Sequence, residues 1–294
     1  MKILITGSNG LLGQKIVKQL SKSSVSFLAT SLGENRNSKC DEGNYQSLDI
    51  TSQKEIRDVV NSYEPTHIIN TAAITNVDFC EDNLELCQKV NVDAVQMMFD
   101  VSKTNNIHFI HLSTDFVFDG KNGPYAEGDA TNPLSVYAKS KNDSEKILLQ
   151  SDYKNWSIIR TIIVYGEGEN LSRSNIVLWA KSALKKGEPL TIVDDQFRSP
   201  TWADDLAWAC VQTGVLRAKG IFHISGPKVF SIYELVCEIA DYFGHDKSLI
   251  KPIKSAKLNQ KAPRPPKTGF VLDKAREVLK YEPMTLRESL QYIS

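Results

Sequence analysis

The sequence predicts an α/β protein, with a doubly wound parallel sheet covered by helices on both faces and a smaller C-terminal lobe. Short apolar runs alternate with helical stretches through the first half of the 294 residues. This alternation requires crossover connections and therefore parallel strands. The first apolar run leads directly into a glycine-rich turn and a helix. The second half is less regular and contains the Pro-rich segment 262–267.

Apolar runs predict strands, and apolar spacing of three and four residues predicts helices. In the first half we expect strands at residues 2–6, 25–30, 67–70, 107–112 and 157–164, and helices at 11–20, 52–62 and 92–104. In the second half we expect helices at residues 175–186, 203–215, 232–243 and 273–279. We expect one domain over residues 1–165 and a lobe over most of 166–294. The segment near 190–225, with a strand-like stretch at 220–225, is expected to return to the first domain.

Composition argues against several classes of protein. Lys plus Arg and Asp plus Glu each total 35, and the resulting formal charge of zero is not typical of nucleic-acid binding. No apolar run reaches the roughly 20 residues that cross a bilayer, and the N-terminus does not have the pattern of a signal peptide. We therefore expect no membrane partner and a cytoplasmic location. The five cysteines are scattered and no HExxH occurs, so we expect neither a disulfide framework nor a metal site.

A glycine loop follows the first predicted strand and reads Gly7-Ser8-Asn9-Gly10-Leu11-Leu12-Gly13. In a GxxGxxG loop the first glycine permits a tight turn, the second lets the backbone approach a pyrophosphate, and the third lets helix and strand pack closely. The following helix N-terminus presents free N–H groups and a positive dipole end to phosphates. The loop therefore predicts a Rossmann-type dinucleotide-binding domain. The expected cofactor contacts are Gly7, Asn9, Gly10, Leu11, Leu12 and Gly13.

The end of the second predicted strand bears on the choice of dinucleotide. It carries Thr30 and Ser31 rather than the acidic residue that holds the ribose 2′-hydroxyl of NAD. Arg36 is placed to meet a 2′-phosphate, so we expect NADPH, with NADH still possible. The alternative for Arg36 is a solvated loop cation. Asp49 is expected either to cap the helix that follows it or to hold the edge of the adenine.

Tyr137 and Lys141 lie four residues apart on a predicted helix, so their side chains share one face. A phenol has a pKa of about 10, and a nearby ammonium stabilises the phenolate. We therefore expect a lowered pKa for Tyr137 and a proton donor close to neutral pH. Thr114 follows a strand at the sheet edge where ligands bind. The sequence predicts that Thr114, Tyr137 and Lys141 form a catalytic set, the alternative being a surface helix pair.

These motifs, in this order, resemble the extended short-chain dehydrogenase/reductase superfamily and more closely its dTDP-4-dehydrorhamnose reductase family. The resemblance runs from residue 2 to about residue 290. Four further stretches carry it: Asn-Thr-Ala-Ala-Ile-Thr-Asn-Val-Asp at 70–78 with Glu81 and Asn91, Ser-Thr-Asp-Phe-Val-Phe-Asp-Gly at 113–120, Arg-Thr-Ile-Ile-Val-Tyr-Gly at 160–166, and Asp-Gln-Phe-Arg-Ser-Pro-Thr at 195–201.

The resemblance implies hydride transfer from a reduced nicotinamide to a nucleotide-activated 4-keto sugar. It implies that Tyr137 protonates the developing alkoxide, that Lys141 also holds the nicotinamide ribose, and that Thr114 hydrogen-bonds the keto oxygen. Further implied cofactor contacts are Ser31, Asp49, Ile50, Thr71, Ala72 and Ala73. Implied substrate contacts are Thr75, Asp115, Val117, Asn175 and Arg198. For Arg198, a diphosphate partner and a structural ion pair are equal alternatives.

One departure concerns the sugar, because Ile163 stands where family members usually carry Trp. The change removes a stacking face and a hydrogen-bond donor. One alternative function is an epimerase or dehydratase of the superfamily, although residue 116 is Phe where a dehydratase has Glu. Another is a non-catalytic nucleotide-binding subunit like the regulatory subunit of methionine adenosyltransferase. A homodimer is possible by analogy with the superfamily.

Overall fold

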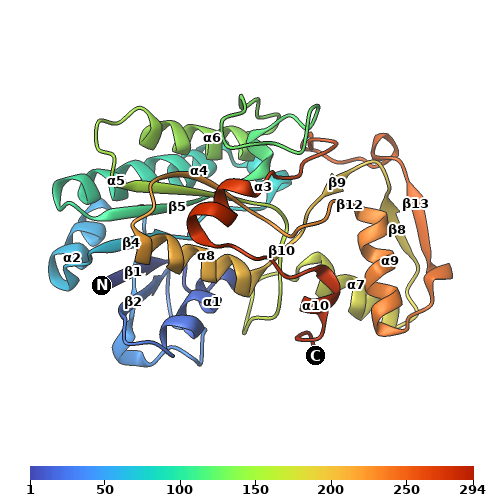
Figure 1. Ribbon diagram of the computed structural model, residues 1–294, viewed down its shortest axis with the longest axis horizontal. Helices are drawn as coiled ribbons and strands as arrows, with labels where there is room; N and C mark the ends of the chain where they lie inside the picture. The colour runs from blue at the N-terminus through green and yellow to red at the C-terminus, as the bar shows by residue number, and fades with distance from the viewer.

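The computed structural model describes residues 1–294. Its centre is a seven-stranded sheet in the order β11-β6-β5-β4-β1-β2-β3, with all neighbours parallel (Figure 1). The strands are β1 (Lys2–Thr6), β2 (Ser26–Ser31), β3 (Tyr45–Ser47), β4 (His67–Asn70), β5 (His108–Thr114), β6 (Trp156–Thr161) and β11 (Gly220–Ile224). The predicted doubly wound α/β fold is confirmed.

Helices cover both faces of this sheet (Figure 1). On one face lie α1 (Leu11–Leu20) and α8 (Ala203–Leu216), and on the other α2 (Gln53–Tyr63), α5 (Ala94–Thr104) and α6 (Val136–Leu149). Alternate residues of β1 belong to the two apolar cores, since Ile3 and Ile5 pack towards α8 and Leu4 packs towards α5. A strand buried on both faces explains its continuous apolar run.

The remaining elements form the lobe at the right of Figure 1 and the segments that lead into it. The third large apolar core lies there, between α7, α9, α10 and β8. The lobe and its connections contain α7 (Ile176–Lys185), α9 (Ile232–Phe243), α10 (Leu286–Leu290), β7 (Val164–Tyr165), β8 (Leu190–Val193), β9 (Phe197–Arg198), β10 (Thr201–Trp202), β12 (Phe230–Ser231) and β13 (Ile250–Ile253). Two further short helices, α3 (Val77–Asp82) and α4 (Leu84–Gln88), lie beside α6.

One predicted strand is shorter in the structure. The strand expected at 157–164 ends at Thr161, because the backbone N–H of Thr201 bonds the carbonyls of Ile162 and Ile163, each at 3.1 Å, and draws the chain out of the sheet. Ile163 has a φ of 33°, a strained value for a β-branched residue. The helix expected at 273–279 is present over those residues, and its last five, Ala275–Leu279, form a π-helical turn.

The strand order reverses between β1 and β4, and this reversal opens a crevice at their carboxyl ends. The glycine loop after β1, the segment after β4 and the turn after β5 all face this crevice. None of the helices combines the length and the apolar character that a membrane crossing demands.

Candidate active site

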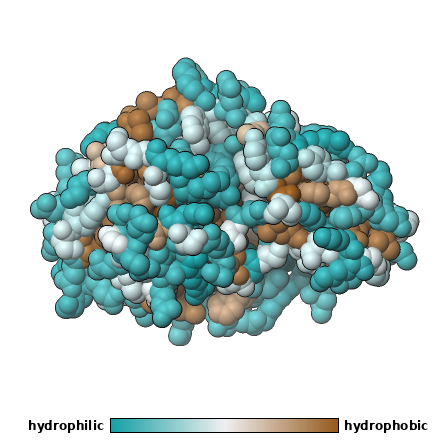
Figure 2. All heavy atoms as spheres, turned by 90° about the horizontal axis from the view of Figure 1, so that it is seen from below, coloured by the Kyte–Doolittle hydropathy of each residue, from teal (hydrophilic) through white to brown (hydrophobic).

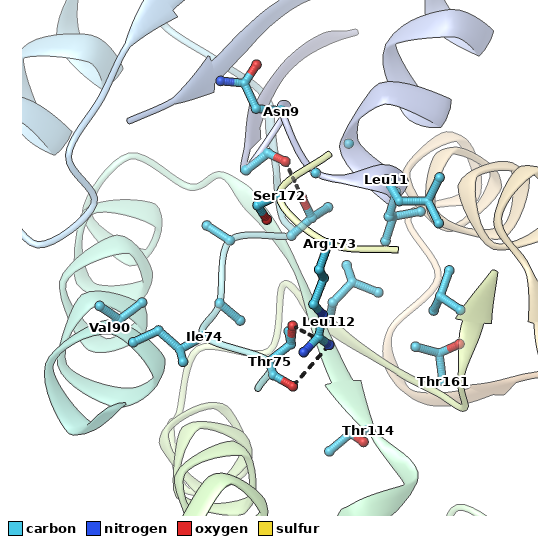
Figure 3. Close-up of a pocket in the computed structure, with 18 of the residues that line it drawn as sticks. Asn9, Leu11, Ile74, Thr75, Val90, Leu112, Thr114, Thr161, Ser172 and Arg173 are labelled. Carbon is cyan, nitrogen blue, oxygen red and sulfur yellow. Dashed lines mark hydrogen bonds between the residues drawn. The ribbon is translucent and has the colours of Figure 1, made fainter. Parts of the chain in front are cut away.

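A cavity of about 900 Å³ occupies the crevice, and Figure 3 shows part of its lining. It brings together every predicted site residue except two, Val117 and Arg198. The predicted residues that line it are Gly7, Asn9, Gly10, Leu11, Leu12, Gly13, Ser31, Arg36, Asp49, Ile50, Thr71, Ala72, Ala73, Thr75, Thr114, Asp115, Tyr137, Lys141 and Asn175.

The glycine loop fits a pyrophosphate. Gly7 has a φ of 73°, and a Cβ there would lie 2.7 Å from the backbone nitrogen of Ala72. A Cβ on Gly13 would lie 2.4 Å from the carbonyl oxygen of Gly7, so only glycine lets α1 start this close to the loop. No side chain caps α1, and its first turn has no acidic residue. Its free N–H groups and positive dipole end therefore suit a phosphate.

The adenosine end of the crevice is formed by the loop after β2. The Asn9 side chain fixes this loop, because its Oδ1 accepts from the Arg36 N–H at 2.9 Å and its Nδ2 donates to the Glu34 carbonyl at 2.8 Å. Arg36 itself is exposed and lines the cavity. The expected helix cap at Asp49 is wrong. Ser52 caps α2, while Asp49 Oδ1 accepts from both the N–H and the hydroxyl of Thr51, each at 2.8 Å.

The three predicted catalytic side chains converge on the cavity from two elements. Thr114 is the last residue of β5, and Tyr137 and Lys141 lie one turn apart on α6. Ser135 caps this helix by accepting from the Ala138 N–H at 3.2 Å, so the first turn that carries Tyr137 is fixed. The exposed fractions are 7% for Thr114, 9% for Tyr137 and 3% for Lys141. The arrangement is therefore a buried site and not a surface helix pair.

A hydrogen-bonded chain behind Lys141 leaves its ammonium available. The Thr6 hydroxyl donates to Asn70 Oδ1 at 2.6 Å, which turns Asn70 Nδ2 towards His111 Nδ1 at 3.2 Å. His111 Nε2 then carries the proton and donates to Ser144 Oγ at 2.9 Å, while Ser144 donates to the Lys141 carbonyl. Lys141 Nζ lies 3.3 Å from the same Nε2, but this protonated nitrogen has no lone pair that could accept a hydrogen bond from the ammonium. Its donors therefore remain free for a ligand.

The expected lowering of the Tyr137 pKa is wrong for this structure. Burial raises the pKa of Tyr137 above its ordinary value of 10, and the Thr114 hydroxyl offsets only part of that rise. Lys141 is not among the charges that act on the phenol. Burial also lowers the pKa of Lys141 from 10.5 to about 8. The sequence spacing placed both groups on one face, but the desolvation that dominates them depends on the folded surroundings.

Asp115 and Arg198 form a buried pair beside the catalytic residues. Arg198 Nε lies 3.6 Å from Asp115 Oδ2, and its other nitrogens donate to backbone carbonyls that include Pro265 at 2.6 Å. Burial raises the pKa of Asp115, and its Oδ1 accepts from the Thr114 hydroxyl at 3.1 Å. Arg198 does not line the cavity, and its pairing with Asp115 favours the ion-pair alternative over the diphosphate contact. Fully buried Val117 packs in the core and also lies outside the cavity.

The lobe side of the cavity contains Asn175 and a cation that sequence reasoning missed. Asn175 caps α7 by accepting from the Leu178 N–H at 3.2 Å, and it donates to the Gly166 carbonyl at 2.7 Å. Arg173 reaches across the opening to the hydroxyl and carbonyl of Thr75, at 3.3 and 3.4 Å (Figure 3). It stands alone in a polar loop, so no motif pointed to it. Ser113 was also missed, and its buried hydroxyl lines the cavity without a partner.

Comparison with known proteins places this geometry in a family. Residues 1–294 match the family described as RmlD substrate binding domain. The chain is 32% identical to a dTDP-4-dehydrorhamnose reductase of Aggregatibacter actinomycetemcomitans, covering 99% of this chain and 98% of the relative. It is 31% identical to methionine adenosyltransferase 2 subunit beta of Danio rerio, covering 90% and 80%.

Solved structures agree with the sequence matches. The crystal structure of a dTDP-4-dehydrorhamnose reductase from Clostridium acetobutylicum ATCC 824 aligns with a TM-score of 0.87 at 31% identity, covering 100% of this chain and 98% of that one. The Bacillus anthracis str. Ames dTDP-4-dehydrorhamnose reductase in complex with NADP aligns with a TM-score of 0.84 at 25% identity, covering 99% and 97%. With a family match over its whole length, the chain belongs to the RmlD substrate binding domain family.

Proposed function

We propose that this protein is an NADPH-dependent reductase of a nucleotide-activated 4-keto sugar, of the dTDP-4-dehydrorhamnose reductase kind. One observation carries the proposal: Thr114, Tyr137 and Lys141 line the same cavity as an uncapped glycine-loop helix. A bound dinucleotide and a carbonyl substrate would meet there. The full-length similarity to a dTDP-4-dehydrorhamnose reductase supports the same reaction.

The chain's own residues supply binding and proton transfer, and NADPH supplies the hydride that goes to the carbonyl carbon. The Tyr137 hydroxyl gives its proton to the oxygen, which becomes an alcohol. Its raised pKa means that the phenol is fully protonated before reaction, as a proton donor must be. The Lys141 ammonium binds the nicotinamide ribose through its free donors. The Thr114 hydroxyl turns from Asp115 to hold the carbonyl oxygen.

The cofactor and substrate ends of the cavity differ in chemistry. We assign the pyrophosphate to the N-terminus of α1 and the 2′-phosphate to exposed Arg36, which makes NADPH the preferred cofactor. A neighbouring structure that contains NADP supports this choice. Ala72 and Ala73 leave room for the cofactor against the strand end. On the lobe side, Thr75, Arg173 and Asn175 are the polar groups assigned to the sugar nucleotide.

Spectrophotometric turnover tests this proposal. Purified protein with NADPH and dTDP-4-dehydrorhamnose should consume the reduced nicotinamide and yield a 4-hydroxy sugar nucleotide. A panel of other keto sugar nucleotides then measures how Ile163 affects the choice of sugar. Absence of turnover with every keto sugar nucleotide, alongside intact NADPH binding, would instead favour the non-catalytic subunit alternative. The similarity to methionine adenosyltransferase 2 subunit beta is the observation that supports this alternative.

We further propose that residues 1–165, together with β11 from the segment near 190–225, form the dinucleotide-binding domain. Most of residues 166–294 then serves as the substrate lobe. The parallel pairing of β11 with β6 supports this division. We propose the cytoplasm as the compartment, since all five cysteines are free thiols. Homodimer formation stays a prediction, which sedimentation equilibrium would test.

A further inference from the structure

Two thiols lie directly behind the wall of the cavity. The Sγ atoms of Cys80 and Cys87 are 2.9 Å apart, and both side chains are fully buried. Cys80 belongs to α3 and Cys87 to α4, two short helices separated only by Asn83. A disulfide needs its sulfur atoms about 2.0 Å apart. The two sulfurs therefore have to approach by about 1 Å to form one.

This pair is in contact with the residues that form the site. Cys80, Cys87 and Tyr137 make one small apolar cluster. Three partly buried residues pack against this cluster and also line the cavity, namely Ile74, Val77 and Phe116. The thiols are thus one layer of side chains away from the place where substrate would bind.

Cys87 also contacts two polar groups that position the site. Its Sγ lies 3.4 Å from Ser140 Oγ and 3.4 Å from Asn91 Nδ2. Asn91 bonds both backbone groups of Ile74, accepting from its N–H at 2.8 Å and donating to its carbonyl at 3.0 Å. Ser140 immediately precedes Lys141 on α6. A displacement of Cys87 would therefore act on the cavity wall and on the catalytic helix together.

We infer that Cys80 and Cys87 form an oxidation site, and that their disulfide lowers turnover by displacing the groups that position Tyr137 and Lys141. The second part of this inference rests on the proposed function. The oxidant is a hydroperoxide. The Cys87 thiolate attacks the peroxide oxygen, the O–O bond breaks, and a Cys87 sulfenic acid forms while the leaving oxygen takes a proton. The Cys80 sulfur then attacks the sulfenic sulfur, the S–O bond breaks, and water departs with the Cys80 proton.

The surroundings of the two sulfurs set the order of these steps. The amide of Asn91 lies 3.4 Å from Cys87 Sγ, so Cys87 is the sulfur of the pair with a polar donor beside it. Burial raises the pKa of Cys80, so Cys80 remains the thiol that attacks second. Water and peroxide reach the pair when the α3–α4 segment opens locally. The outer face of that segment meets solvent, since its large apolar side chains Phe79, Leu84 and Leu86 are 39%, 58% and 44% exposed.

The disulfide should reduce kcat more than it changes the KM for NADPH. Bond formation draws Cys87 away from Ser140, which precedes Lys141, and from Asn91, which bonds the backbone of Ile74. It leaves the glycine loop untouched. A misplacement of about 1 Å at a catalytic group costs up to about 100-fold in rate. We expect a fall in kcat of roughly tenfold.

The test treats the full-length protein with hydrogen peroxide and measures intact mass, peptide maps and NADPH turnover, before and after dithiothreitol. We expect a loss of two hydrogen atoms, a Cys80–Cys87 cross-link, and a fall in kcat that dithiothreitol reverses. Cys87→Ser should keep its turnover under peroxide. Cys237→Ser, which removes a partly exposed thiol elsewhere, should remain as sensitive as the unchanged protein. Cys80→Ala provides a second resistant variant if Cys87→Ser folds poorly.

Three outcomes would overturn the inference. The first is loss of turnover while Cys80 and Cys87 both remain reduced. The second is equal peroxide sensitivity in Cys80→Ala or Cys87→Ser. The third is a complete cross-link that leaves kcat unchanged, which refutes its effect on the site. If the reduced protein has no turnover at all, the proposed function fails, and the mass and peptide measurements still decide whether the disulfide forms.

Discussion

Lowering the pH from about 7 to about 5 should destabilise this protein strongly, because its core contains neutral histidines. Burial, the largest cause in each case, lowers the pKa of His67 to about 4 and the pKa values of His108 and His223 to about 3. His67 and His108 have ring centroids 5.5 Å apart, and each has a buried ring nitrogen without a partner. Protonation there would place two unpaired charges side by side in the core.

The magnitude follows from proton linkage. An unfolded histidine has a pKa of about 6.5 and gains most of a proton between about pH 7 and pH 5, whereas these folded histidines gain almost none. The unfolded state therefore binds more protons, and each histidine lowers the free energy of unfolding by about 2 kcal/mol over this range. Asp205 acts in the opposite direction, because burial raises its folded pKa to about 6. Protonation of Asp205 in the folded state raises the free energy of unfolding by about 1.4 kcal/mol over the same range.

The loss expected from these four groups together is about 5 kcal/mol, a large share of the 5–15 kcal/mol typical of a whole domain. Urea unfolding followed by circular dichroism at several pH values between about 7 and 5 measures it. His108→Phe should reduce the pH dependence by about 2 kcal/mol. Tyr153→Phe removes a hydrogen bond to the Ile107 carbonyl and should lower stability equally at every pH in this range. A free energy of unfolding that stays constant or rises between about pH 7 and pH 5 would refute the reasoning.

Three further predictions concern the cavity. Gly13→Ala places a Cβ 2.4 Å from the Gly7 carbonyl oxygen and should weaken NADPH binding by at least about tenfold in fluorescence titration. The control Gly128→Ala, with nothing within 4 Å of its Cβ, should bind NADPH normally. Equal affinities of the two variants would contradict the close packing of the loop. Arg36→Ala should raise the KM for NADPH by about tenfold and leave the KM for NADH unchanged. An equal rise in both KM values would refute the assignment of Arg36 to the 2′-phosphate. Turnover should fall as the pH rises through about 8, where buried Lys141 loses its proton, and a kcat that stays flat to about pH 9.5 would show that the ammonium is not required.

Local patterns predicted the central fold because its signals are short-range. The glycine loop and the Tyr137–Lys141 spacing depend on residues within one turn of each other, and the structure gives both as expected. The strand at 157–164 was predicted too long, because its early end depends on Thr201, about 40 residues away. The pattern of apolar residues along the strand gives no information about that hydrogen bond.

The site was predictable where a motif faces the crevice and not where tertiary packing redirects a side chain. Val117 and Arg198 both belong to motifs, yet the turn after β5 sends Val117 into the core. Backbone carbonyls of Pro265 and Pro266, contributed from far along the chain, enclose Arg198. Arg173 reaches Thr75 across 98 residues of sequence, so only the folded structure reveals it.

The pKa of Tyr137 also depends on tertiary packing and could not be predicted from residue spacing. A nearby ammonium was expected to lower it, but burial raises it instead. The extent of burial depends on α3, α4 and the turn after β5, which no spacing rule describes.

The most direct measurement of the catalytic role is single-turnover reduction of dTDP-4-dehydrorhamnose by the protein saturated with NADPH, compared with Tyr137→Phe. The phenol is the only proton donor assigned to the carbonyl oxygen. Hydride transfer in Tyr137→Phe should therefore slow by at least about 100-fold while NADPH affinity stays within about twofold. An unchanged rate of nicotinamide oxidation in that variant would contradict the assignment of this cavity as the reductase site.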